Sequence, residues 1–120
     1  MRFEDAELLL VEFLHPYVAP LRVASMVPKD RPESFVRVWR TGGSALNRVL
    51  DQPMLTVQAW GPDCWELAGV CRDAIHHHGS NIRLLRGLEE VSGPYGDPDP
   101  ATGVDRVSFT IQALLRATRT

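Results

Sequence analysis

The chain has few cysteines, and this scarcity limits the compartments and the chemistry that suit it. Only two of its 120 residues are cysteines, Cys64 and Cys71. They lie seven positions apart in a segment that we expect to be helical, which separates their Cα atoms by roughly 10 Å. A disulfide needs less than about 7 Å. We therefore expect two buried free thiols in a protein that folds in a reducing cytoplasm.

Long hydrophobic runs and an excess of one charge are also missing. No apolar run approaches the roughly 18 residues of a membrane-spanning helix, and acidic residues precede the run Leu8–Val11, where a secretory signal would be basic. The absence of such a run predicts no membrane partner. The 13 basic and 15 acidic residues give a formal charge of −2, and this balance predicts no sequence-specific binding to nucleic acid.

Motifs of known catalytic or cofactor chemistry are absent as well. The pair Gly42-Gly43 lacks the lysine of a phosphate-binding loop, and Cys64 and Cys71 do not form a Cys-x-x-Cys pair. Three histidines are adjacent, from His76 to His78, but neighbouring helical side chains point about 100° apart and cannot converge on one ion. The sequence therefore predicts no catalytic residue, no cofactor and no dedicated metal site.

Two further clusters are better explained by structure than by ligands. Asp97, Asp99 and Asp105 lack the glycine and the glutamate of a calcium-binding loop, so they are expected to form turns. Arginine and tryptophan interleave from Arg37 to Arg40, a pattern that can stack on single-stranded nucleic acid but is also typical of a half-buried strand. We favour the strand.

A chain of this length is expected to fold as a single domain over residues 1–120. Periodicity and turn residues predict helix, weak strand, strand, strand, helix, strand and strand. The predicted ranges are 4–14 (stopped by Pro16), 21–26, 35–40, 54–60, 63–78 (with N-cap Asp63 and a left-handed Gly79), 82–91 (bent at Gly87) and 107–116, with loops at 41–53 and 93–105. This order predicts an α+β fold in which two helices pack on one face of a single, mostly antiparallel sheet of four to five strands.

Several short motifs stand out between residues 40 and 110 of the chain. They are Arg40-Thr41-Gly42-Gly43, Asn47-Arg48-Val49-Leu50-Asp51 with Pro53, the strand from Leu55 to Trp60, Val91-Ser92-Gly93-Pro94, Asp97-Pro98-Asp99 and Arg106-Val107-Ser108-Phe109-Thr110. These motifs resemble the tail terminator family of long-tailed phages, particularly phages of actinobacteria. The resemblance covers about residues 4–116.

The resemblance implies a structural protein of the virion rather than an enzyme. It implies a homo-oligomeric ring, typically a hexamer, that caps the tail tube at the head–tail junction and ends its polymerisation. The implied partners are other copies of the chain, the tail tube protein and a head-completion or connector protein, with DNA passing through the ring after assembly in the host cytoplasm. By the same resemblance, the residues expected at subunit or tube contacts are Arg40, Asn47, Arg48 and Asp51. The alternative for Asn47 and Asp51 is that their side chains only form hydrogen bonds within their own turn.

Two other functions remain open from the sequence. One is another head–tail connector or adaptor of the neck, and the other is a small metal-dependent enzyme that uses the histidines 76–78.

Overall fold

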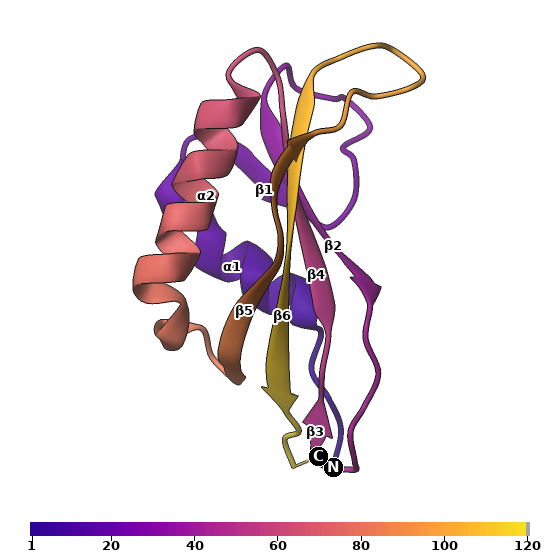
Figure 1. Cartoon of the computed structure of the whole chain (residues 1–120), viewed down its shortest axis with the longest axis vertical. Coiled ribbons are helices and arrows are strands. Elements are labelled where there is room, and N and C mark those ends of the chain that lie inside the picture. Colours follow the sequence, from indigo (N-terminus) through magenta and orange to yellow (C-terminus); the bar gives the residue numbers. More distant parts are fainter. Residues whose placement is uncertain (120) are drawn as a thin grey trace.

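The computed structural model describes residues 1–119 as two helices against one twisted sheet (Figure 1). The helices are α1 (Ala6–Val18) and α2 (Cys64–His78), and a 3-10 turn, η1 (Gly79–Asn81), follows α2. The strands are β1 (Arg22–Ala24), β2 (Phe35–Gly42), β3 (Leu50–Asp51), β4 (Met54–Trp60), β5 (Leu85–Gly96) and β6 (Arg106–Arg116). The α+β class and the order of the main elements are as the sequence predicts.

The sheet runs β1-β2-β4-β6, with β5 and β3 both paired to β6. All pairings are antiparallel except β1 with β2, which is parallel. The short strand β3 pairs with the last residues of β6. The mostly antiparallel sheet is confirmed, but it has six strands rather than four to five, because β3 forms inside a segment that we expected to be only a loop.

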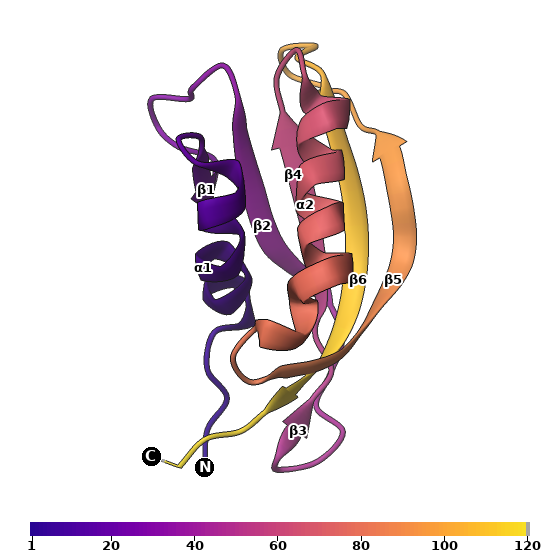
Figure 2. The same cartoon turned by 90° about the vertical axis from the view of Figure 1, so that its left-hand side faces the viewer.

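Both helices cover the same face of the sheet, as Figure 2 shows from the helix side. Alternate residues of β4 and β6 point to this face and are fully buried, including Leu55, Val57, Val107 and Phe109. They pack against Leu10 and Leu14 of α1 and Cys71 and Ile75 of α2 in one core. The opposite face of the sheet is left without a helical layer.

Two details at the helix ends differ from the sequence prediction. Pro16 lies inside α1 instead of stopping it, and the helix closes with a bond from Ala19 N to His15 O. Proline there removes only one backbone bond near the helix end, and buried Leu14 and Val18 hold the last turn in the core. Asp63 occupies the N-cap position of α2, but its side chain makes no capping bond.

Gly79 was predicted to end α2 in a left-handed conformation, and this is wrong. Its φ of −60° is right-handed, and the chain continues into η1. The left-handed residues come later, at Leu84 (φ 68°) and Gly87 (φ 57°). The predicted bend at Gly87 is confirmed as a register shift between β5 and β6, and β5 extends to Gly96, further than predicted.

Both cysteines are buried and free. Burial raises the pKa of the Cys71 thiol to about 12, and burial, together with the nearby Asp105 carboxylate, raises the pKa of Cys64. Because the thiolate is the reactive form, neither cysteine should react with a thiol reagent at pH 8 while the chain is folded. Mass spectrometry after a timed pulse of iodoacetamide should show no label in buffer and two labels in urea. Labelling of Cys71 in the native protein would contradict its position in the core.

No helix within residues 1–119 combines the length and apolar character needed to cross a membrane.

Candidate functional site

The segment 43–53 between β2 and β4 forms a narrow projection at the end of the molecule where the described termini lie (Figure 1). We call this segment the arm. It folds back on itself through bonds from Leu46 N to Leu50 O (2.8 Å) and from Gln52 N to Ser44 O (3.2 Å). The bond from Ala117 N to Val49 O (2.9 Å) ties it to the chain that follows β6. The arm is therefore a braced structure rather than a free loop.

An ion pair between Arg40 and Asp51 holds the base of the arm. Two guanidinium nitrogens of Arg40 donate to the two carboxylate oxygens of Asp51, at 2.6 and 2.9 Å. The same guanidinium donates to the carbonyl oxygens of Gly42 (3.0 Å) and Gly43 (3.2 Å). These hydrogen bonds from Arg40 hold the pKa of Asp51 below its usual value and raise that of Arg40, although burial opposes both shifts. One side chain thus links the end of β2 to both sides of the arm.

Asn47 bonds its own turn, as its alternative interpretation proposed. Its side-chain oxygen accepts from Val49 N (2.9 Å) and Leu50 N (3.0 Å). Arg48 is exposed at the arm tip. The structure therefore places Asn47, Arg48 and Asp51 in the arm and Arg40 at its base. Hydrogen bonds of Arg40, Asn47 and Asp51 shape the arm, and Arg48 is exposed at its tip.

Sequence reasoning missed the apolar character of the arm tip. Leu46 is 57% exposed and Val49 is 41% exposed, beside Arg48. These two residues make the arm tip an exposed apolar surface. The signal was present in the sequence, because apolar residues flank Asn47 and Arg48 in a segment rich in turn-forming residues.

The open face of the sheet carries a groove of about 590 Å³. Its floor is a chain of hydroxyls, in which Thr56 lies 3.0 Å from Thr41 and 2.9 Å from Thr110 (Oγ1 to Oγ1). Trp39 and Tyr95 are among the residues that line the same groove. The Arg37 guanidinium stacks on Trp39 at 4.2 Å, and its buried Nε has no hydrogen-bond partner within residues 1–119. The predicted strand with interleaved arginine and tryptophan is thus confirmed as partly buried, and its Arg37 and Trp39 side chains stack.

The upper part of the same face is fixed by Asp97. Its carboxylate accepts from Gln58 (2.9 Å) and Ser108 (3.1 Å), and its carbonyl accepts from Arg106 (2.6 Å). Asp99 accepts from Thr102 (2.6 Å), a bond that lowers the pKa of Asp99. Asp99 thus orders its own loop, as the turn-forming interpretation predicted, whereas the Asp97 carboxylate bonds side chains of β4 and β6.

The hydroxyl of Thr56, which lies between those of Thr41 and Thr110 in the floor of the groove, should contribute to the stability of the fold. Thr56→Val should lower the free energy of unfolding by about 1–1.5 kcal/mol, because it leaves the buried hydroxyl of Thr110 without its partner. Thr41→Val is the matched control and should cost less than about 0.5 kcal/mol, since Thr41 is exposed to water. Urea unfolding followed by tryptophan fluorescence measures both. Equal losses in the two variants would contradict the proposed importance of the buried bond.

The three histidines have separate environments at the end of α2. His76 lies 3.8 Å from Glu90, His77 Nδ1 bonds the Asp73 carbonyl at 2.9 Å, and His78 stacks on Tyr17 with ring centroids 5.8 Å apart. No set of three or more histidine, cysteine or acidic side chains placed to hold a metal ion occurs in the described part of the chain.

A comparison with known families adds one finding to this geometry. Residues 2–120 match the family described as phage tail termination protein. The chain belongs to that family. A comparison with curated proteins finds no match. Membership in the phage tail termination family makes the chain a component of the phage tail, with a structural role.

Proposed function

We propose that the chain forms a ring on the end of the phage tail tube, stops addition of further tube subunits and presents the surface that joins the tail to the head. Membership in the phage tail termination family over residues 2–120 carries this proposal. In this proposal the chain lies at the head–tail junction of the virion, and its partners are other copies of itself, the tube protein and a head connector. The ring is proposed to be a hexamer, wide enough for DNA to pass.

The arm supplies a contact suited to the tube. Its tip offers Leu46, Arg48 and Val49 to a partner, while the Arg40–Asp51 pair keeps it in place. A preformed apolar contact loses little conformational entropy on binding, which favours capture of a tube end. In this proposal Arg48 contacts the tube directly, and Arg40, Asn47 and Asp51 position the arm.

Polymerisation of the purified tube protein of the same phage tests the function. When the chain is added at the start, it should shorten the tubes, and electron microscopy should show extra density at one end only. Leu46→Asp/Val49→Asp should abolish both effects, whereas Leu8→Asp, an exposed leucine on α1, should leave them unchanged. Tubes of unaltered length without end density would overturn the proposal. Binding to the head connector alone would instead favour an adaptor on the head side of the neck.

A further inference from the structure

The charges of the chain are separated along its length, although the net charge is only −2. The molecule extends 41 Å along its longest axis. One end holds the β1–β2 loop, the start of α2 and the β5–β6 loop, and the other holds the arm, η1 and the described termini (Figure 1). The two ends carry opposite charge.

The end with the start of α2 is acidic. Within residues 1–119, no ion pair neutralises five of its carboxylates, which are Asp30, Glu33, Asp63, Glu66 and Asp105. The basic side chains at this end without an ion pair in the same residues are Arg22 and Lys29. The end with the arm is basic. Its guanidiniums without an ion pair in the same residues are Arg2, Arg48, Arg86, Arg116 and Arg119, because Arg83 pairs with Glu4 and Arg40 with Asp51. They outnumber the carboxylates of Asp5 and Glu7 at the start of α1, which also lack an ion pair in these residues. Charges this far apart do not neutralise one another, since salt screens them beyond about 8 Å.

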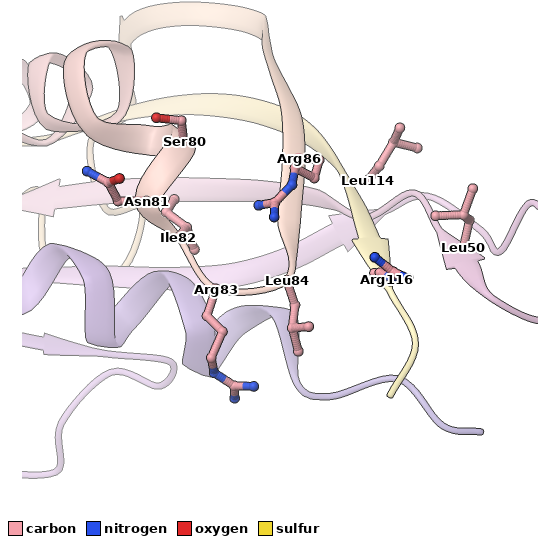
Figure 3. Close-up of a pocket in the computed structure, with 9 residues that line it drawn as sticks. All are labelled: Leu50, Ser80, Asn81, Ile82, Arg83, Leu84, Arg86, Leu114 and Arg116. Carbon is pink, nitrogen blue, oxygen red and sulfur yellow. The ribbon is translucent and has the colours of Figure 1, made fainter. Parts of the chain in front are cut away.

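The basic end contains a groove of about 580 Å³ with an apolar lining (Figure 3). Leu50, Leu84 and Leu114 contribute its apolar surface, and Arg86 and Arg116 stand over it from β5 and β6. Figure 3 shows the Arg86 side chain extending from β5 toward the η1 turn, while Arg83 points away from it. Leu84 is held in a left-handed conformation (φ 68°), which is unfavourable for leucine and keeps its side chain at the groove.

The acidic end carries an exposed aromatic side chain, Trp65, that suits this groove. Trp65, in the first turn of α2, is 60% exposed, and a Cβ added at Gly96 of β5 would lie 3.8 Å from its ring. Asp63 and Glu66 flank it in the sequence. Tryptophan is the residue most typical of the anchoring positions in protein interfaces, and here it is surrounded by charge opposite to that of the groove.

We propose that neighbouring copies of the chain join head to tail, with Trp65 of one copy seated in the Leu50–Leu84–Leu114 groove of the next and Asp63 and Glu66 facing Arg86 and Arg116. The occupant is a second copy because the chain itself carries both halves of the match, at opposite ends. Such a contact joins two different surfaces and therefore forms a ring when the rotation between copies closes. The proposal rests on the ring of the proposed function and assigns its subunit contact.

Two charge-reversal variants and their mixture test the assignment. The groove variant is Arg86→Glu/Arg116→Glu, and the anchor variant is Asp63→Arg/Glu66→Arg. Asp63 makes no capping bond, so its replacement removes no hydrogen bond from α2. Each variant alone should associate about 100-fold more weakly than the wild type, because like charges then face each other. An equimolar mixture should restore association, since every contact in an alternating assembly pairs opposite charges.

Light scattering and native mass spectrometry over a range of concentrations give the readout, with circular dichroism to show that each variant is folded. Trp65→Ala should also weaken association without changing its dependence on salt. Wild-type chain that stays monomeric at millimolar concentration, variants that associate like wild type, or a mixture that does not recover would each overturn the assignment. If the variants still form rings that cap tubes, the assigned contact is wrong but the proposed function is supported. If the wild type forms rings through this contact that do not bind tube ends, the contact is supported and the proposed function is wrong.

Discussion

Arg40→Ala should lower the free energy of unfolding by about 2–3 kcal/mol at pH 7. The change leaves the Asp51 carboxylate, which is only 5% exposed, without the guanidinium that pairs with it at 2.6 and 2.9 Å. Loss of one partner from a fully buried pair costs about 3–5 kcal/mol. The expected value is lower because the Arg40 side chain is 34% exposed, so water already screens part of the interaction.

The loss should depend on pH in a direction that the ion pair fixes. Arg40 depresses the pKa of Asp51 in the folded chain below its ordinary value of 3.8. The stabilisation is therefore fully present above that value and is lost as the pH falls through the lowered pKa. Wild type and Arg40→Ala should differ most at neutral pH and converge as the pH falls through the lowered pKa of Asp51.

Urea unfolding of a double-mutant cycle isolates the pair. Arg40→Ala and Asp51→Ala, singly and together, should give a coupling energy of about 1–3 kcal/mol. Arg48→Ala, at the exposed arm tip, is the control and should change stability by less than about 0.5 kcal/mol. A loss in Arg40→Ala no larger than in Arg48→Ala would show that the pair does not hold the arm.

Regular elements were predictable from the sequence because each depends on neighbouring residues. The strand Met54–Trp60 has the predicted bounds, since alternation and the flanking Pro53 and Gly61 define both ends. The apolar stripe of the segment 63–78 likewise predicted the second helix, α2. The α+β class follows from the order of such elements.

Features that depend on distant contacts were not predictable. β3 has only two residues and exists because Leu50 and Asp51 meet the end of β6, more than sixty positions later. Helix α1 continues past Pro16 because Val18 reaches the core, which no local pattern indicates.

The candidate site was likewise predictable only where it depends on neighbouring residues. A resemblance in the segment 40–53 located the arm, but it did not reveal that Arg40 and Asp51 bond each other across eleven positions. The charge separation between the two ends was also hidden, since each end gathers residues from three or more separate segments. Only the topology of the sheet brings those segments together.

Gly43→Ala should be as damaging as the loss of the ion pair, with an expected cost of about 2–4 kcal/mol. A Cβ at Gly43 would lie 2.0 Å from the Gln52 carbonyl oxygen and 3.0 Å from Met54 N, both backbone atoms. The φ of +88° adds the strain of a left-handed conformation, about 1–2 kcal/mol for a residue with a side chain. The neighbouring Gly42→Ala is the matched control, because its Cβ would meet only the Met54 sulfur at 3.7 Å. Urea unfolding of the two variants measures the difference.

Tube capping by the same two variants separates the arm from the rest of the fold. The backbone oxygen that the new methyl group displaces belongs to Gln52, inside the arm, so Gly43→Ala should move the arm while the core of β4 and β6 remains intact. The variant should therefore lose tube capping at temperatures where circular dichroism still shows it folded, whereas Gly42→Ala should cap tubes normally. Full capping by a folded Gly43→Ala chain would mean that the position of the arm does not matter, and the tube contact would then have to lie elsewhere on the molecule. The open face of the sheet, where Trp39 and Tyr95 line the groove above the threonine floor, would be the next surface to test.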